Sequence, residues 1–362
     1  MQQPIILTEE QHAQGDLTAL RSTQSIWEER DVYELQLKEL FEIDNPSQKH
    51  RVDHAEQESA FIAERTTAPA DHFRGTWVYF PWSGRLVHML NKGDYDRLRT
   101  NRNRDLITQE EQAKLLTATI GIVGLSVGSN VAPALAYSGI GGTLKICEFD
   151  TLETSNMNRI RARVDQIGLT KLELCTQQLY EVNPFINIRD FPFALTRDVL
   201  SGFVEDSPAP QVIYEIIDSF EMKIHLRSLA RKARIPVIMV TNLGDRVLMD
   251  VERYDLDPTI EYFNGRAGNI PQDMLDRPDL TDADKHRYAV DLAGVEHIPE
   301  RAMESVRQIG KTLIGRPQLA TTVTVAAGFS AYFAKKIILG DTTVSGSWLI
   351  DLDKLFTKDA SL

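Results

Sequence analysis

The feature that most constrains the fold is a regular alternation of short apolar runs with helix-length amphipathic segments, which begins at Thr117. In chain order the segments read TIGIVG, VAPALAYSG, TLKICEFD, TKLELCTQQLYEV and INIRDFPF, followed by VIYEIID and IPVIMVT on either side of SFEMKIHLRSLARKAR. Buried apolar runs that alternate with helices are typical of parallel strands covered on both faces. The pattern therefore predicts an α/β fold with at least five strands in a doubly wound, mainly parallel sheet.

The remainder of the chain does not follow this alternation. Residues 1–93 form a charged accessory segment that is largely helix-like, and a predicted hairpin at 73–92 ends near an expected boundary at Asp94. We assign 94–362 to the main domain. Within it, residues 254–300 are rich in Asp, Pro and Gly, and we expect an insertion or crossover there rather than core. A long buried helix is expected in GRPQLATTVTVAAGFSAYFAKKIIL, with Pro317 in its first turn and Gly340 after its end.

Composition excludes several classes of protein. The 362 residues carry a formal net charge of −12, which argues against a general nucleic-acid or membrane surface. The N-terminus lacks a basic segment followed by an apolar stretch, and no run approaches the roughly 20 apolar residues that span a bilayer, so we expect a cytoplasmic protein. Cys147 and Cys175 are the two cysteines and form no C-x-x-C pair; we expect buried thiols and no zinc site.

A glycine-containing turn follows the first apolar run of the alternating region. In TIGIVGLSVGS, Gly124 stands first, Ser126 replaces the usual second glycine, and Gly128 comes last. Unpaired N–H groups at such a helix start can hold a phosphate, although a purely structural turn would look the same. Asp150 ends the next apolar run, 26 positions after Gly124, where a carboxylate accepts ribose hydroxyls. The alternative for Asp150 is a capping role. Together these features favour a Rossmann-like nucleotide site for either NAD or ATP.

The segment after Asp150 is more specific. It contains Ser155, Asn156 and Arg159, and then Ile167, Gly168 and Lys171. This order resembles the Ser-Asn-x-x-Arg and Ile-Gly-x-x-Lys motifs of ThiF/MoeB-type adenylyltransferases in the ubiquitin-activating (E1-like) superfamily. The resemblance is strong over about 98–250 and looser over 300–340; Ile160 stands where the family often has Gln. It implies that Gly124, Ser126, Gly128, Asp150, Ser155, Asn156, Arg159 and Lys171 bind ATP. Without the shared motif, Arg159 and Lys171 would be interpreted as solvated helix residues.

The resemblance also implies a reaction. A carboxylate attacks the α-phosphate of ATP, and the catalytic Arg159 and Lys171, with a metal ion, stabilise the charge that develops. The family has an Asp-x-x-Asp at the end of its fourth strand, whose second carboxylate holds Mg²⁺. Asp218 occupies that position here and Glu215 occupies the first. The alternative for Asp218 is a helix N-cap.

An arginine before the first strand completes the implied site. In homodimeric relatives an Arg that matches Arg104 reaches the γ-phosphate bound to the partner, and Asp105 replaces the family's Gln here. Arg102 is the alternative. A homodimer that uses ATP and Mg²⁺ is therefore expected, with Arg104, Arg159, Lys171 and Asp218 as its catalytic residues.

The second half-reaction and the substrate stay open. No cysteine follows Cys175, so we expect adenylation without a thioester on this chain. The acid could be a small molecule, a peptide or ubiquitin-like C-terminus, or a modified transfer-RNA base, and the acidic chain makes transfer RNA the less favoured. Two other functions are compatible with part of the pattern: an NAD-dependent oxidoreductase, and a non-catalytic partner subunit of an adenylating enzyme.

Overall fold

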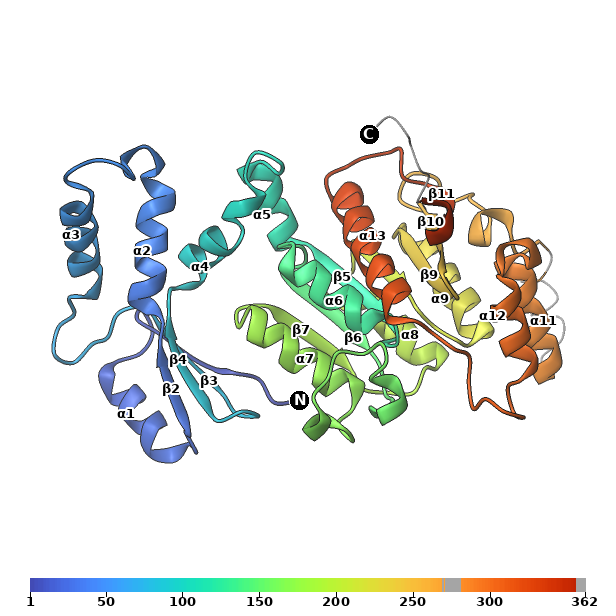
Figure 1. Cartoon of the computed structure of the whole chain (residues 1–362), viewed down its shortest axis with the longest axis horizontal. Coiled ribbons are helices and arrows are strands. Elements are labelled where there is room, and N and C mark those ends of the chain that lie inside the picture. The colour runs from blue at the N-terminus through green and yellow to red at the C-terminus, as the bar shows by residue number, and fades with distance from the viewer. Residues whose placement is uncertain (269, 271–280, 356–362) are drawn as a thin grey trace. The chain divides into compact units, whose positions relative to one another are not determined.

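The structure is a computed structural model that describes residues 1–268, 270 and 281–355 (Figure 1). These residues divide into two compact units. The first unit contains Met1–Gln112 together with Leu179–Phe185, and the second contains Ala113–Gln178 and Ile186–Leu362.

The first unit is built on a four-stranded sheet with the order β1-β3-β4-β2. Its strands are β1 (Ile5–Thr8), β2 (Glu28–Asp31), β3 (Thr76–Phe80) and β4 (Arg85–Met89); its helices are α1 (Gln14–Thr23), α2 (Tyr33–Asp44), α3 (His54–Thr66) and α4 (Lys92–Arg99). The predicted hairpin is confirmed, because β3 pairs antiparallel with β4. The prediction of a largely helical segment was wrong at β1 and β2, which are four-residue strands that depend on pairing with β3 and β4.

The second unit contains a seven-stranded sheet with the order β11-β10-β9-β8-β5-β6-β7. The strands are β5 (Thr119–Val123), β6 (Thr143–Cys147), β7 (Asn187–Phe191), β8 (Val212–Glu215), β9 (Val237–Leu243), β10 (Arg246–Glu252) and β11 (Gly346–Asp351). The five predicted strands are β5 to β9 and are mutually parallel, whereas β10 and β11 extend the sheet antiparallel. The doubly wound, mainly parallel fold is thus confirmed.

Helices cover this sheet on both faces. The helices of this unit are α6 (Gly128–Tyr137), α8 (Arg197–Glu205), α9 (Phe220–Ala233), α11 (Asp282–Ala293), α12 (Glu300–Arg307), α13 (Ala320–Ile338) and α14 (Leu352–Leu355). Helices α5 (Gln109–Thr117) and α7 (Lys171–Val182) cross the division between the units. Adjacent residues of β8 show the two faces, because side chains alternate along a strand. Ile213 packs with Phe203 of α8 and Leu226 of α9, whereas the Tyr214 hydroxyl donates to the carbonyl of Ser330 in α13 at 2.6 Å. Helix α13 also packs along α6.

This arrangement places a ligand crevice at a defined point. Strand order reverses at β5, which lies between β6 and β8. From β5 the chain continues to β6 on one side, and from β8 it continues to β9 on the other side. In open α/β sheets ligands bind at the carboxyl ends of strands where the order reverses. The residues that follow β5, β6 and β8 are therefore the ones that meet a ligand.

Two sequence-based expectations about the second half of the chain need correction. The segment 254–300, of which 269 and 271–280 lie outside the described residues, follows β10 and leads to α12. Its residues Tyr254 and Phe263 are fully buried and belong to the core. The long helix is confirmed, but it begins at Ala320 and Pro317 precedes it. The preceding residues stay extended because Gln318 is held from both sides: its carbonyl accepts from Asn158 Nδ2 and its side chain accepts from Ser126.

Short 3-10 helices occupy several of the connections. They are η1 (Pro46–Gln48), η2 (Asn101–Asn103), η3 (Thr154–Asn156), η4 (Val164–Gln166), η5 (Tyr262–Gly265) and η6 (Val295–His297). Within the described ranges, no helix combines the length and apolar character needed to cross a bilayer.

Candidate active site

The turn between β5 and α6 has the geometry of a phosphate loop. Gly124 has φ +97°, and a Cβ atom at this position would lie 2.1 Å from the carbonyl oxygen of Ile216, so only glycine fits. The N–H groups of Ser126 and Val127 have no hydrogen-bond partner in the part of the chain that the structure describes. Unpaired donors at a helix start are suited to hold an anion.

Glu148 fixes this loop, and the sequence analysis did not include it. Its carboxylate accepts the N–H of Leu125 at 2.8 Å, that of Phe149 at 2.8 Å and that of Asp150 at 3.0 Å. The side chain is buried, so these three bonds satisfy a charge that would otherwise be costly. An acidic residue directly after a buried strand was the available signal.

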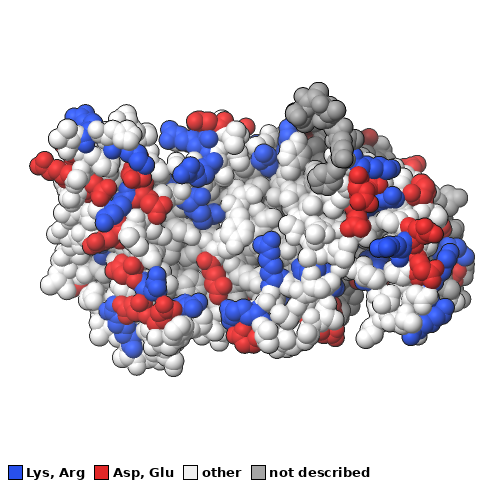
Figure 2. All heavy atoms as spheres, viewed as in Figure 1, with Lys and Arg blue, Asp and Glu red and all other residues white. Residues whose placement is uncertain are grey.

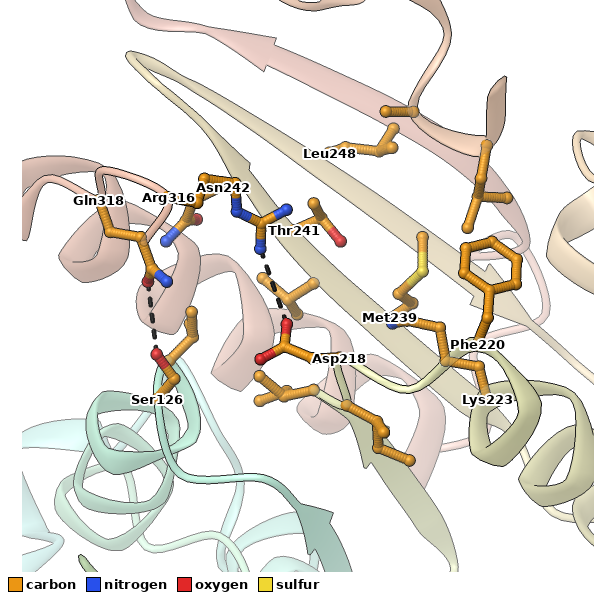
Figure 3. A pocket seen from close by; sticks show the side chains of 16 residues that line it. Ser126, Asp218, Phe220, Lys223, Met239, Thr241, Asn242, Leu248, Arg316 and Gln318 are labelled. Atoms are coloured by element: carbon orange, nitrogen blue, oxygen red, sulfur yellow. Dashed lines mark hydrogen bonds and ion pairs between the residues drawn. The ribbon is translucent and has the colours of Figure 1, made fainter. Parts of the chain in front are cut away.

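Five side chains from separate parts of the chain meet beside the loop: Ser126, Arg159, Asp218, Arg316 and Gln318. Arg159 Nε donates to Ser126 Oγ at 3.4 Å, and Ser126 Oγ donates to Gln318 Oε1 at 3.4 Å. Arg316 Nη2 lies 3.8 Å from Asp218 Oδ1. A dashed line marks this ion pair in Figure 3. Burial lowers the pKa of Arg159; Asp218 opposes this effect and Arg316 adds to it, which shows that the three charges act on one another.

Lys171 and Asp150 form a second charged group. Lys171 Nζ lies 2.7 Å from Asp150 Oδ2, and the two side chains are 10% and 50% exposed. The alternative that Arg159 and Lys171 are solvated residues on a helix face is wrong. Lys171 begins α7 but is buried, and Arg159 lies in the irregular segment after η3. The structure therefore brings Lys171 to Asp150, and it brings Arg159 to Ser126, where the charge of Asp218 acts on it.

Ser155 and Asn156 stabilise the local turn in this structure. Asn156 Oδ1 accepts the N–H of Glu153 at 3.1 Å, and Ser155 Oγ donates to Glu153 Oε2 at 3.3 Å. The turn then delivers Arg159, whose carbonyl accepts from Asn130 Nδ2 of α6 at 2.9 Å. Further on, Gly168 has φ +94° in the turn before α7, which explains a glycine three residues before Lys171.

Asp218 and Glu215 have different environments, although the motif pairs them. The Asp218 side chain is 98% exposed, and the N-cap of α9 is Ser219, so the capping alternative for Asp218 is wrong. Glu215 is fully buried and lies 2.6 Å from Lys223 Nζ and 2.8 Å from Arg227 Nη1. It cannot share a metal ion with Asp218. No group of three or more His, Cys, Asp or Glu side chains suited to a metal occurs in the described ranges. One exposed carboxylate beside a phosphate loop nevertheless fits Mg²⁺, which takes one or two carboxylates plus phosphate oxygens.

The other predicted residues lie elsewhere. Arg102 and Arg104 are at η2 in the first unit and are both exposed. Cys147 and Cys175 are buried, and burial, with the nearby Glu148 charge, raises the pKa of each thiol to about 12.

Sequence reasoning also missed Arg316, Gln318 and Asn242. Arg316 and Gln318 lie in the GRPQ segment before α13, far along the chain from the loop they join, and nothing local marks them. Asn242 is a polar residue near the carboxyl end of the apolar strand β9. That position was a usable signal, because the carboxyl ends of parallel strands line the ligand crevice.

Comparison with known proteins places the chain in a family. Residues 99–358 match the ThiF family. The chain is 35% identical over 276 residues to an uncharacterised Mycobacterium tuberculosis protein, MT1398. This match covers 76% of this chain and 38% of that protein. It is 34% identical over 116 residues to ubiquitin-like modifier-activating enzyme 5 of Arabidopsis thaliana, covering 32% of this chain and 26% of that enzyme.

The chain therefore spans less than two fifths of the length of these relatives. Among solved structures, PaaA has a similar fold, with a TM-score of 0.52 and 20% identity over 86% of this chain and 93% of PaaA. The matched residues include the phosphate loop, both charged groups and the helix that follows Gln318. The chain belongs to the ThiF family.

Proposed function

We propose that the protein adenylates a carboxylate with ATP. A carboxylate oxygen forms a bond to the α-phosphorus, the bond between that phosphorus and the bridging oxygen breaks, and pyrophosphate leaves with the electron pair. The products are an acyl-adenylate and pyrophosphate. The observation that carries the proposal is the meeting of Arg159, Arg316 and Asp218 beside the unpaired loop N–H groups. Hydride transfer would not need two cations there.

Each residue of this group has a role in the proposal. The N–H groups of Ser126 and Val127 would hold a phosphate, and Gly124 and Gly128 let the chain turn closely into α6. Arg159 and Arg316 would stabilise the charge that spreads over the phosphoryl oxygens and the departing pyrophosphate. Asp218 would hold Mg²⁺, which supplies additional positive charge at the phosphates. When ATP binds, Arg316 would release Asp218 and pair with a phosphate instead.

The Asp150 and Lys171 pair has a distinct position in the proposal. Asp150 would accept the ribose hydroxyls, because it follows β6, on the other side of β5 from Asp218. Lys171 would orient Asp150 and reach the phosphates, while Ser155 and Asn156 would hold the turn that presents Arg159. Residues 94–362 would form the catalytic domain and 1–93 an accessory segment.

We propose further that the enzyme is a cytoplasmic homodimer in which Arg104, or else Arg102, completes the partner's site. Both side chains are exposed and free to extend. The acyl group would leave the adenylate without a thioester on this chain, because Cys147 and Cys175 are buried with their thiol pKa values raised to about 12. An amine, an internal cyclisation or a thiol on another protein would accept it.

A peptide, protein or small-molecule acid is the favoured substrate. A ubiquitin-like modifier-activating enzyme is among the relatives, which supports a C-terminal carboxylate. Transfer RNA is less favoured, because acidic and basic side chains are interspersed on the face in Figure 2 and the net charge is −12.

The test is to trap the intermediate. Purified protein is incubated with ATP, Mg²⁺ and cell extract, and hydroxylamine converts any acyl-adenylate to a hydroxamate that mass spectrometry identifies. AMP and pyrophosphate should appear in equal amounts together with one dominant hydroxamate. Binding of NAD with no ATP-pyrophosphate exchange would instead support the oxidoreductase. ATP binding with no exchange in extract would support the non-catalytic subunit.

A further inference from the structure

A cavity beside the phosphate loop has two chemically different ends. Its volume is about 90 Å³. Figure 3 shows the polar side chains of Ser126, Asp218, Asn242, Arg316 and Gln318 toward one end, and the apolar side chains of Phe220, Met239 and Leu248 toward the other. Leu292 and Ala293 of α11 complete the apolar wall. All of these residues belong to the second unit.

The position of the cavity separates it from the nucleotide. Asp150 follows β6, on one side of β5, whereas the cavity lies beside β8 and β9, on the other side. The ribose and base would therefore extend away from the cavity. Its polar end contains Ser126 and Asp218, where the phosphates would lie. A group in the cavity would thus be next to the α-phosphate, which is the place of the attacking acid.

The apolar end has the size of one aliphatic side chain. An apolar cavity of about 150 Å³ holds a benzene molecule. The volume of about 90 Å³ includes the polar end of this cavity, so the apolar end admits a smaller group, at most the side chain of leucine or methionine. A glycine at the end of the substrate would leave this end without a partner. The one charged group there, Lys223, is already paired with Glu215 at 2.6 Å and does not require an acidic ligand.

Asn242 provides the polar contact. The residue is 5% exposed, and neither Nδ2 nor Oδ1 has a hydrogen-bond partner among the residues that the structure describes. Buried amides are nearly always paired, so both polar atoms of Asn242, which lines this cavity, are available to a ligand. The amide offers one donor and one acceptor on the same edge. The N–H and C=O of one extended amino-acid residue point the same way, so the residue can donate to Oδ1 and accept from Nδ2. Two residues in antiparallel strands exchange hydrogen bonds in the same manner.

We propose that the cavity selects an acid that is the C-terminal residue of a peptide, or an N-acyl amino acid, with an aliphatic side chain no larger than leucine or methionine. Asn242 Nδ2 donates to the carboxylate and Oδ1 accepts the N–H of the same residue, while the side chain fills the apolar end. This inference rests on the proposed adenylation.

The first experiment measures kcat/KM for ATP-pyrophosphate exchange with acetyl-Ala-Ala-X peptides, where X is Gly, Ala, Leu, Met, Phe, Asp or Lys. One methylene in an apolar pocket changes discrimination by about 10- to 200-fold, so Leu and Met should exceed Gly by at least about 100-fold. Cell extract serves as the positive control. Equal rates with Gly and Leu, or exchange with extract but with no peptide, would overturn the selectivity while leaving adenylation intact. If there is no exchange with extract either, and no ATP binding, both the selectivity and the proposed adenylation are contradicted.

Two variants connect the selectivity to these residues. Ala293→Leu should fill the apolar end and leave ATP affinity unchanged. It should lower the rate with the Leu peptide at least about tenfold relative to the rate with the Ala peptide. Ala19→Leu, the same change at an exposed position on α1, should keep the preference for Leu. A preference that Ala293→Leu does not alter would place the acid elsewhere.

The contact with Asn242 has its own test. Acetyl-leucine is compared with the ester analogue, in which oxygen replaces its N–H. An unpaired buried acceptor costs about 1–3 kcal/mol, so wild type should prefer the amide by about 5- to 150-fold. In Asn242→Ala that ratio should fall to about one, whereas a merely structural role would leave it unchanged.

Discussion

Lys171 Nζ lies 2.7 Å from Asp150 Oδ2, and the backbone N–H of Lys171 also donates to the carbonyl of Asp150 at 2.8 Å. The sequence motif assigns Asp150 to the ribose and Lys171 to the phosphates, and in the structure two hydrogen bonds connect these residues. The pair holds the start of α7 against the end of β6. In the proposed site, this pair would hold Asp150 in place for the ribose.

Asp150→Ala should weaken ATP binding at least about tenfold, which is about 1.4 kcal/mol, because it removes the ribose acceptor and leaves Lys171 unpaired. Calorimetric titration with ATP measures the change. Asp165→Ala is the matched control, because it breaks an exposed pair with Arg163 at 3.0 Å in the same region. Equal affinities for both variants and wild type would remove Asp150 from the site.

Single alanine changes at Arg159, Lys171 and Asp218 should each lower substrate-dependent ATP-pyrophosphate exchange by about 10²–10³, or roughly 3–4 kcal/mol, since each removes charge that the transition state needs. Their combined effect should be far from additive. Circular dichroism spectra should match wild type. Additive losses would show that the three residues act separately.

Hybrid dimers test the shared site. Arg104→Ala and Asp218→Ala chains, each inactive alone, should recover up to about a quarter of the exchange activity when mixed, because some hybrid dimers contain one intact site. Mass spectrometry of the native dimers verifies that chains exchange. Arg102→Ala takes the place of Arg104→Ala in a parallel mixture. Verified exchange with no recovery in either mixture would contradict completion across an interface.

Cys147→Ser and Cys175→Ser should retain both exchange and overall turnover. Because the pKa of each thiol is raised to about 12, both remain protonated at neutral pH, and iodoacetamide should not label the folded protein at pH 8. The measurements are exchange, turnover and the mass of the alkylated protein. A variant that keeps exchange but loses turnover would reveal a covalent acyl-enzyme.

Glu215→Gln should destabilise the protein by about 3–5 kcal/mol at pH 7, because it leaves buried Lys223 without its carboxylate partner and leaves Arg227 with Glu252 alone. Burial raises the pKa of Glu215, but the charges of Lys223 and Arg227 outweigh this effect and hold it below the ordinary 4.5. The contribution of this carboxylate is therefore present above pH 4.5 and is lost as the pH falls further. Urea unfolding between pH 7 and pH 3 should show a steeper acid decline for wild type than for the variant.

The sequence by itself determined the parallel sheet and the order of its motifs. Strands β5 and β8 are buried along their whole length and are therefore apolar throughout, and that local pattern is visible in the sequence. Gly124 and Gly168 are likewise fixed by their own backbone angles. Strands β1 and β2 could not be predicted in the same way, because four residues become a strand only when a distant partner supplies the hydrogen bonds.

Only the tertiary structure decided which side chains meet. Asp218 and Glu215 are three positions apart, yet one is almost fully exposed and the other is buried against Arg227, because side chains in a strand and in the turn after it face different surroundings. Arg316 and Asn242 join the candidate site through the packing of α13 and β9, from positions far along the chain. Contacts of that kind depend on the path of the whole chain, which no local pattern of residues records.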